Sequence, residues 1–302
     1  MPTLAVLSLF VPVLFVVNIL FVIYWIARLK RQFLLSAIIL LLGFPYVDDM
    51  YKFSGKKIIS NNDIKIMSYN VRMFNLYLWN KRDSIPDKMY KLINDAQPDI
   101  LALQEFHNHS EVGFQYPYKY TKTKSNTNRF GLTIQSKYPI INSGCFDFEN
   151  SANNIIYADL IIQQDTVRVY NIHLESLKLN AQEENFGEKN SDKLLRRLKT
   201  GFKKQVLQVE QFLEHQKNWD GKTIVCGDFN NTPFSWAYTK ISKGKKDAFI
   251  EAGKGFGKTF DYTFPVRIDF IFTDPSFEIN YYKTFNESYS DHFPILTHIK
   301  KE

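Results

Sequence analysis

Six short polar motifs follow or flank apolar segments in the last three quarters of the chain. They are Ser68-Tyr69-Asn70, Leu103-Gln104-Glu105, Asn171-Ile172-His173-Leu174-Glu175, Gly227-Asp228-Phe229-Asn230, Arg267-Ile268-Asp269 and Ser290-Asp291-His292. A β-strand that stops at a polar residue presents that side chain at the end of its sheet, where clefts form. The carboxylates, imidazoles and carboxamides of these motifs are the groups needed to hold a hard divalent cation and to hydrolyse a phosphate ester. The set therefore predicts a metal-dependent phosphohydrolase.

Each motif taken alone also has a purely structural explanation. Asn70 can close a turn after a strand, and Glu105 can be a surface carboxylate. Asp228 can form an Asx turn, and Asp291 can cap the segment before Pro294. Short motifs of this kind often match by chance, so the prediction depends on finding the whole set in one chain and in one order.

The segments between the motifs alternate between strand and helix from Ile64 onward. Apolar patterns predict strands at 64–69, 99–103, 131–135, 140–146, 155–162, 167–172, 223–225, 268–273, 277–285 and 295–299, and helices at 84–95, 194–215 and 235–241. The polar segment 178–193 is expected to be a mobile insertion, and the glycine-rich segment 253–257 a flexible loop. Many antiparallel strands with helices between them indicate an α/β fold, a two-sheet α/β sandwich.

The first 47 residues differ from the rest of the chain. Residues 1–27 carry no charged side chain, and a second uncharged run occupies residues 32–47. The first run is long enough to cross a bilayer as a helix, whereas the second is marginal and can alternatively be a buried core helix. A signal peptide is disfavoured because the run has neither a basic n-region nor a small-x-small cleavage site. We expect a transmembrane helical hairpin at 1–47 as a membrane anchor, a linker at 48–61 and a catalytic domain at 62–302.

The charges around the two apolar runs predict the orientation of this anchor. Arg28, Lys30 and Arg31 lie between the runs and favour a cytoplasmic turn, although three lysines shortly after the second run oppose that orientation. A cytoplasmic turn places the catalytic domain on the extracytoplasmic side of the bilayer. The expected location is the inner membrane of a bacterium.

Overall charge and cysteine content add weaker constraints. The formal net charge is +7 and the pI is near 9.1, with basic residues gathered at 119–129, 193–204 and 240–246. Such clusters attract anionic substrates or acidic lipid headgroups, but a solvated surface explains any single cluster equally well. Cys145 and Cys226 are too few for a disulfide framework and lack zinc-site spacing, and Cys226 is expected to be a buried thiol.

Residues 62–299 resemble the endonuclease/exonuclease/phosphatase superfamily, which includes DNase I-like nucleases, abasic-site endonucleases, neutral sphingomyelinases, inositol-polyphosphate phosphatases and deadenylases. The six motifs match those of the family in the same order. The resemblance implies a DNase I-like fold and hydrolysis of phosphoester bonds with Mg2+ or Mn2+ as the cofactor. It also implies that Glu105 binds the ion directly, with Asn70 beside it and Asp291 completing the site.

The same resemblance implies roles for the other motif residues. Asp269 and His292 match a carboxylate–imidazole pair, in which the carboxylate holds the tautomer of the ring and raises its basicity. Asp228 is then placed to orient or deprotonate the attacking water, and Asn230 to position that water or the phosphate. His173 is placed to contact a phosphate oxygen or the leaving group. The general base is either Asp228 or His292.

These observations together predict a membrane-tethered hydrolase of phosphodiesterase or nuclease type. Its substrate is a phosphoester (a nucleic acid, a phospholipid or an inositol phosphate), and a lipid or inositol phosphate phosphodiesterase or phosphatase is the alternative. A catalytically idle binding scaffold is disfavoured because Glu105, Asp228 and His292 are all present. The lipid bilayer is the expected partner of residues 1–47, and nothing in the sequence indicates an obligate protein partner. The His107-x-His109 pair and segment 253–258 are not expected to bind metal or phosphate.

Overall fold

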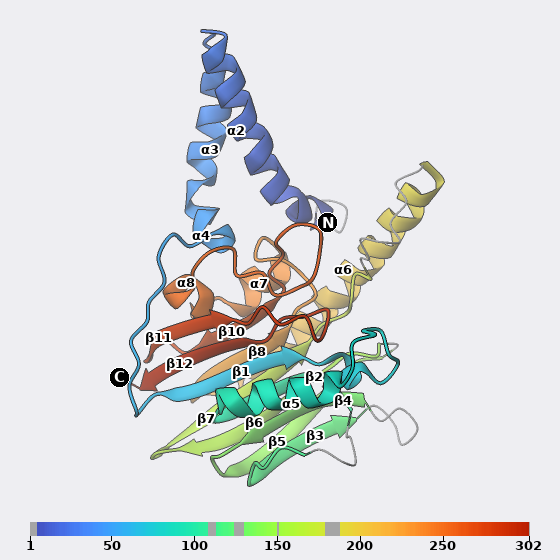
Figure 1. Ribbon diagram of the computed structural model, residues 1–302, viewed down its shortest axis with the longest axis vertical. Helices are drawn as coiled ribbons and strands as arrows, with labels where there is room; N and C mark the ends of the chain where they lie inside the picture. The colour runs from blue at the N-terminus through green and yellow to red at the C-terminus, as the bar shows by residue number, and fades with distance from the viewer. Residues whose placement is uncertain (1–4, 108–112, 124–129, 150, 179–187, 302) are drawn as a thin grey trace.

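A computed structural model describes residues 5–107, 113–123, 130–149, 151–178 and 188–301 of the chain. Its strands form two six-stranded sheets, and apolar side chains from both sheets form one core between them. In Figure 1 this sandwich occupies the lower part of the molecule, and a helical hairpin projects from it. The predicted two-sheet α/β sandwich, preceded by two apolar helices, is confirmed.

The first sheet brings two of the motifs side by side. Its strands, in spatial order, are β11 (Phe277–Thr284), β12 (Ile295–Lys301), β1 (Ile64–Asn70), β2 (Ile100–His107), β4 (Phe130–Ser136) and β3 (Tyr118–Thr123). β1 and β2 run parallel, with Asn70 opposite Gln104. The pairing of β2 with β4 is interrupted between Leu103 and Phe106, and Glu105 has a φ of 48° within this bulge. A bulge re-aims a side chain, so Asn70 and Glu105 come to the same end of the sheet.

The second sheet brings three further motifs together. Its strands, in spatial order, are β5 (Ile140–Asp147), β6 (Asn154–Ile162), β7 (Asp165–His173), β8 (Lys222–Asp228), β10 (Asp269–Thr273) and β9 (Lys246–Asp247). β7 and β8 run parallel, with His173 opposite Asp228. β10 runs antiparallel to β8, with Asp269 also opposite Asp228. The strand pairing alone therefore places these three side chains at one edge of the sheet.

Helices cover the outer face of each sheet, giving four layers (Figure 1). The two long covering helices are α5 (Ile85–Ala96) and α6 (Glu188–Lys217). In β1, Ile66 faces the core between the sheets, whereas its neighbour Met67 packs with α5. In β8, Ile224 faces the same central core and Val225 packs with α6. Because successive side chains of a strand point to opposite faces, a strand buried on both faces needs a continuous apolar run.

The N-terminal residues form a helical hairpin. It consists of η1 (Val6–Phe10), α2 (Val11–Ala27), α3 (Phe33–Gly43), η2 (Phe44–Tyr46) and α4 (Val47–Met50). Two apolar helical stretches, Val6–Ala27 and Phe33–Met50, have 22 and 18 residues and are long and apolar enough to cross a membrane. In the most apolar 18 residues of each stretch, 0% of the first and 6% of the second is buried. The second stretch is therefore not a buried core helix.

Several elements differ from the sequence-based expectation. β3, β9 and α8 (Ala248–Ala252) are not predicted, because β3 alternates tyrosines with polar residues at a sheet edge and the other two are too short to show a period. The prediction of an insertion at 178–193 is wrong at its C-terminal end, because helix α6 already begins at Glu188. Residues 179–187 of this segment lie outside the described part of the chain. The glycine-rich segment is tied down, because Gly255 and Lys52 exchange two backbone hydrogen bonds of 2.8 and 2.9 Å. Cys226 is buried, as expected.

Candidate active site

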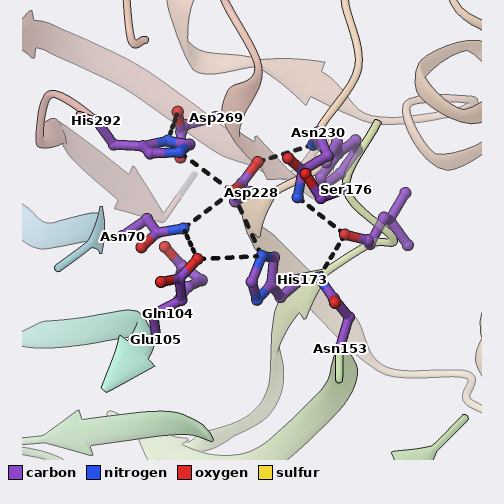
Figure 2. Close-up of polar contacts among 12 residues, drawn as sticks. Asn70, Gln104, Glu105, Asn153, His173, Ser176, Asp228, Asn230, Asp269 and His292 are labelled. Carbon is purple, nitrogen blue, oxygen red and sulfur yellow. Dashed lines mark hydrogen bonds and ion pairs between the residues drawn. The ribbon is translucent and has the colours of Figure 1, made fainter. Parts of the chain in front are cut away.

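The strand ends that carry the motifs meet around one cavity of about 500 Å³. Of the predicted site residues, Glu105, His173, Asp228, Asn230, Asp291 and His292 line it. Figure 2 shows the side chain of Glu105 from one sheet and those of His173 and Asp228 from the other pointing toward one another, with Asn230 and His292 beside Asp228. Asn70 and Asp269 lie directly behind them and are almost fully buried. The structure therefore gathers all eight predicted site residues at one place.

Asp228 is the centre of the polar network, with 1% of its surface exposed. Its Oδ2 accepts a hydrogen bond of 3.0 Å from Asn70 Nδ2 and lies 3.6 Å from His173 Nε2 and 3.5 Å from His292 Nε2. Its Oδ1 accepts a hydrogen bond of 2.7 Å from the backbone N–H of Asn230. Burial raises the pKa of Asp228 to about 6, and the charge of His292 opposes this rise. The carboxylate is thus fixed in orientation and more basic than an exposed aspartate.

Asp269 and His292 form the predicted contact. The carboxylate oxygens of Asp269 lie 3.0 and 3.2 Å from His292 Nδ1, and both residues are buried. The backbone N–H of Asp269 donates to Thr259 Oγ1 at 3.1 Å, which holds the start of β10 in place. Burial alone would lower the pKa of His292, but the charges of Asp269 and Asp228 outweigh it and raise the pKa well above its usual value. The ring is therefore held as a cation, with Nε2 directed at Asp228.

His173 occupies the other side of Asp228. Its Nε2 lies 3.6 Å from Asp228 Oδ2 and 4.0 Å from Glu105 Oε1. Burial lowers the pKa of His173 and outweighs the opposing charge of Asp228. The two histidines of the site consequently differ in charge, since His173 is neutral where His292 is a cation.

Glu105 and Asn70 supply oxygen atoms that fit a hard divalent cation. Asn70 Nδ2 donates to Glu105 Oε1 at 3.3 Å, and Asn70 Oδ1 accepts from the backbone N–H of Arg72 at 3.1 Å, which leaves one lone pair free. Burial and the nearby charge of Asp291 raise the pKa of Glu105. Burial is the larger cause of this rise, and a divalent cation between Glu105 and Asp291 would offset both the burial and the repulsion of the two carboxylates. Mg2+ and Mn2+ prefer such carboxylate and amide oxygens, so the donor set fits either ion.

A second group of possible ligand atoms lies deeper in the site. Atoms of Asp228, Asp269 and His292 all lie within 4.8 Å of one another. Both nitrogens of His292 face carboxylates, and a protonated imidazole has no lone pair for a metal ion. The imidazole therefore already supplies the positive charge in this group, and Glu105 with Asn70 is the better site for a cation.

Two predicted residues have partners outside the central network. Asp291 Oδ2 forms an ion pair of 3.0 Å with Arg72 Nη1, and its Oδ1 accepts from Ser290 Oγ at 3.1 Å. The side-chain amide of Asn230 donates to the carbonyl oxygen of Leu174 at 2.9 Å. Both residues still line the cavity, and both are less buried than Asp228.

Sequence reasoning missed a buried amide bridge behind the site. Gln104 Nε2 donates to Asn171 Oδ1 at 2.7 Å, joining β2 of one sheet to β7 of the other. Asn171 Nδ2 donates to the backbone carbonyls of Leu103 and Thr133, both at 2.9 Å. The sequence motifs did contain a sign of this bridge. Gln104 and Asn171 each interrupt an apolar strand, and an amide buried at such a position needs hydrogen-bond partners. Of the discounted His107-x-His109 pair, His109 lies outside the described residues.

The fold and the site together define a class of protein, a two-sheet α/β sandwich with a carboxylate–imidazole centre at the ends of its strands. A family model described as "Endonuclease/Exonuclease/phosphatase family" matches residues 67–292, and the chain belongs to this family. A second family model, a domain of unknown function (DUF8431), matches residues 1–50. No curated protein matches the chain.

Solved structures share the fold at low sequence identity. An endonuclease/exonuclease/phosphatase family protein from Bacteroides thetaiotaomicron is 18% identical, covers 78% of this chain and 94% of its own, and has a TM-score of 0.56. D. rerio TDP2, complexed with a single-strand DNA product, is 16% identical, covers 80% of this chain and 100% of its own, and has a TM-score of 0.57. A mannosyl-6-phosphatase from Bacteroides thetaiotaomicron is 18% identical, covers 78% of this chain and 99% of its own, and has a TM-score of 0.55.

Proposed function

We propose that this chain is a Mg2+- or Mn2+-dependent hydrolase of phosphoester bonds, of phosphodiesterase or nuclease type, tethered to a membrane by residues 1–47. Family membership supports phosphoester hydrolysis. One observation carries the proposal: the buried carboxylate of Asp228 faces the cavity with Asn70, His173 and His292 all within 3.6 Å of it. The names of the similar structures include a DNA complex and a sugar phosphatase, so the fold leaves the substrate open.

Glu105 and Asn70 would hold the divalent ion, and Asp291, which also lines the cavity, would complete the site. When bound, the ion supplies positive charge to the oxygens of the phosphoryl group and of the leaving group. Arg72 pairs with Asp291 at 3.0 Å and adds a fixed cation beside the same region. The ion and the guanidinium together favour a phosphate anion at the mouth of a site whose floor is otherwise acidic.

Asp228 is the group that we assign as general base. Hydrogen bonds from Asn70 and from the backbone of Asn230 fix its carboxylate, and its pKa of about 6 leaves it ionised at neutral pH. His292 keeps its proton between two carboxylates, so it stabilises charge and does not accept the proton of the attacking water. His173 is neutral and is placed to donate a hydrogen bond to a phosphate oxygen or to the leaving oxygen.

The proposed location is the extracytoplasmic face of a bacterial inner membrane. The two candidate spans are joined by the basic residues Arg28, Lys30 and Arg31, and a cytoplasmic turn puts the catalytic domain, proposed at 62–302 after a linker at 48–61, on the opposite side. Figure 1 is consistent with this arrangement, since the turn of the hairpin lies at the end far from the sandwich.

A substrate panel tests the proposal. The full chain in detergent would be incubated with plasmid DNA, single-stranded RNA, sphingomyelin, an inositol polyphosphate and bis-p-nitrophenyl phosphate, with and without Mg2+. We expect hydrolysis of at least one substrate that requires the added ion and disappears in Asp228→Asn. A chain that hydrolyses none of them in Mg2+ or Mn2+ would contradict the proposal.

A further inference from the structure

The first apolar helix forms part of the wall of the catalytic cavity. Leu9, Phe10 and Val13 line the same cavity as Asp228 and His292. These three residues belong to the first two turns of the candidate span Val6–Ala27. A bilayer that surrounds this span would therefore meet the cavity mouth directly, and the mouth would open at the membrane surface.

Packing at both ends of the hairpin fixes this arrangement. At the N-terminal end, Val6 is buried against Leu177, Leu198 and Phe202 of the catalytic domain. Val6 thereby attaches the start of the first span to α6 and to the segment after β7. These apolar contacts place the beginning of the helix beside the cavity.

The other end of the hairpin is held by polar contacts. Tyr238 Oη, from α7 (Trp236–Ile241), lies 3.2 Å from Asp49 Oδ1 and 2.8 Å from Asp247 Oδ2. Arg267 Nη2 lies 3.9 Å from the same oxygen, and Arg267 Nη1 is anchored on Asp247 at 2.7 Å. Figure 1 shows α4 meeting the sandwich beside α7 and α8, while the start of α2 lies toward α6. With both ends attached, the cavity keeps one orientation relative to the bilayer.

An aromatic path leads from the catalytic imidazole toward the cavity mouth. The ring of Phe260 lies 5.0 Å from that of His292, and Tyr262 stacks on Phe260 at 6.3 Å. Phe264 follows at 5.1 Å from Tyr262 and is 41% exposed. All three aromatic side chains line the cavity. The polar residues around His292 are thus followed, toward the cavity mouth, by aromatic side chains that would pack against a hydrocarbon chain.

The charge of the cavity wall also limits the substrate. Among the described residues that line the cavity, Lys178 is the one lysine or arginine. Nucleic-acid strands are held by cations that track several successive phosphates, and this wall does not provide them. A single phosphate with an apolar remainder matches Lys178 in the lining, Arg72 beside Asp291, a divalent ion and an apolar wall.

We propose that the substrate is a membrane lipid with a phosphoester headgroup, which enters the cavity sideways from the bilayer. The proposal rests on the proposed function, because the headgroup would lie at Asp228 and His292. The hydrocarbon chain would lie between Leu9, Phe10 and Val13 on one side and the Phe260–Phe264 aromatics on the other. Water forms a new P–O bond at phosphorus, the ester P–O bond breaks, and the leaving oxygen takes a proton, so the products are an alcohol and a phosphate acid.

A chain-length series tests this inference with soluble probes. The full chain in digitonin, a detergent without an alkyl chain or phosphate, would be assayed on two pairs of substrates. One pair is ethyl and octyl p-nitrophenyl phosphate, which are diesters, and the other is ethyl and octyl phosphate, which are monoesters. Each buried methylene favours binding about threefold to fourfold, so even partial burial of the octyl chain should raise kcat/KM at least about tenfold over the ethyl probe.

Matched variants connect the effect to the cavity wall. Leu194 lies on α6 and lines the cavity, whereas Leu207 lies on the same helix, is 62% exposed and is not among the lining residues. Leu194→Gln should lower the octyl-to-ethyl ratio by about fivefold or more, because a polar side chain then faces the alkyl chain. Phe264→Ser, at an exposed position on the opposite wall, should lower the same ratio. Leu207→Gln should leave the ratio unchanged.

The outcomes separate the two proposals. Hydrolysis of ethyl and octyl probes at equal kcat/KM would overturn the lipid inference and leave the hydrolase intact. A single-stranded DNA oligonucleotide cleaved with a higher kcat/KM than either octyl probe would likewise overturn it in favour of a nuclease. Hydrolysis of no probe, monoester or diester, in Mg2+ or Mn2+ would remove the proposed function and the lipid inference together.

Discussion

Replacing Asp269 by asparagine should abolish most of the activity without unfolding the protein. Asp269 and His292 are buried and joined at 3.0 and 3.2 Å, so the substitution leaves the imidazole without its counter-charge. Breaking a buried ion pair by removing one partner costs about 3–5 kcal/mol. If that loss falls on a transition state that needs the charged imidazole, the rate falls about 10²- to 10⁴-fold, at 1.36 kcal/mol for each factor of ten.

The assay is the initial rate of bis-p-nitrophenyl phosphate hydrolysis in Mg2+, together with thermal unfolding of each variant. Asp159→Asn is the matched control, because Asp159 forms a buried pair with Arg168 at 2.6 and 2.7 Å away from the cavity. This control should lower the melting temperature and leave the rate nearly unchanged.

Coupling between the two residues is the stronger part of this prediction. His292→Ala should cost at least as much as Asp269→Asn, and the double variant little more than the worse single one, because the two groups act as a unit. Strictly additive losses, or an Asp269→Asn variant that keeps more than about a tenth of the rate, would refute the reasoning about the pair.

Three further predictions concern the metal, the amide bridge and the topology. Glu105→Gln should lose activity at low Mg2+ and recover part of it in excess Mn2+, because a neutral amide is a poorer ligand; full activity at low Mg2+ would remove Glu105 from the metal site. Asn171→Leu should lower the free energy of unfolding by about 1–3 kcal/mol in a urea titration, because it removes the three buried hydrogen bonds that Asn171 makes with Gln104 and with the carbonyls of Leu103 and Thr133. An unchanged midpoint would show that the bridge is dispensable. A reporter that is active only in the cytoplasm should be silent when fused after Glu302 and active when inserted in the 28–32 turn, and the reverse pattern would invert the proposed topology.

Much of the fold follows from local patterns in the sequence. The apolar runs around Ile66 and Ile224 identify strands buried on both faces, and the polar residue that ends each of β1, β7 and β8 marks the edge where the site forms. The contact of Asp269 with His292 was implied by the resemblance of the motifs to the family, and the structure shows it. The apolar periodicity of the sequence did not predict strand β3. A polar strand at the edge of a sheet has no buried face, so it shows no apolar pattern.

Contacts between distant segments were beyond the sequence patterns. The pairing of Asp291 with Arg72 joins the last motif to the turn after β1, and no spacing between the two residues encodes it. The packing of Val6 on α6 is equally invisible, because an apolar residue in a candidate span is accounted for by the bilayer alone. Such contacts depend on how the finished layers meet, and they require the three-dimensional structure.

The most direct test of the central claim is the dependence of phosphoester hydrolysis on both Mg2+ and Asp228. Rates on bis-p-nitrophenyl phosphate and p-nitrophenyl phosphate would be measured for the full chain, for Asp228→Asn and for Asp95→Asn, an exposed aspartate on α5. The account predicts activity that is lost on chelation, restored by Mg2+, unaffected in Asp95→Asn and reduced at least about 10²-fold in Asp228→Asn. Equal rates in the Asp228→Asn variant, or rates that persist unchanged after chelation, would contradict it.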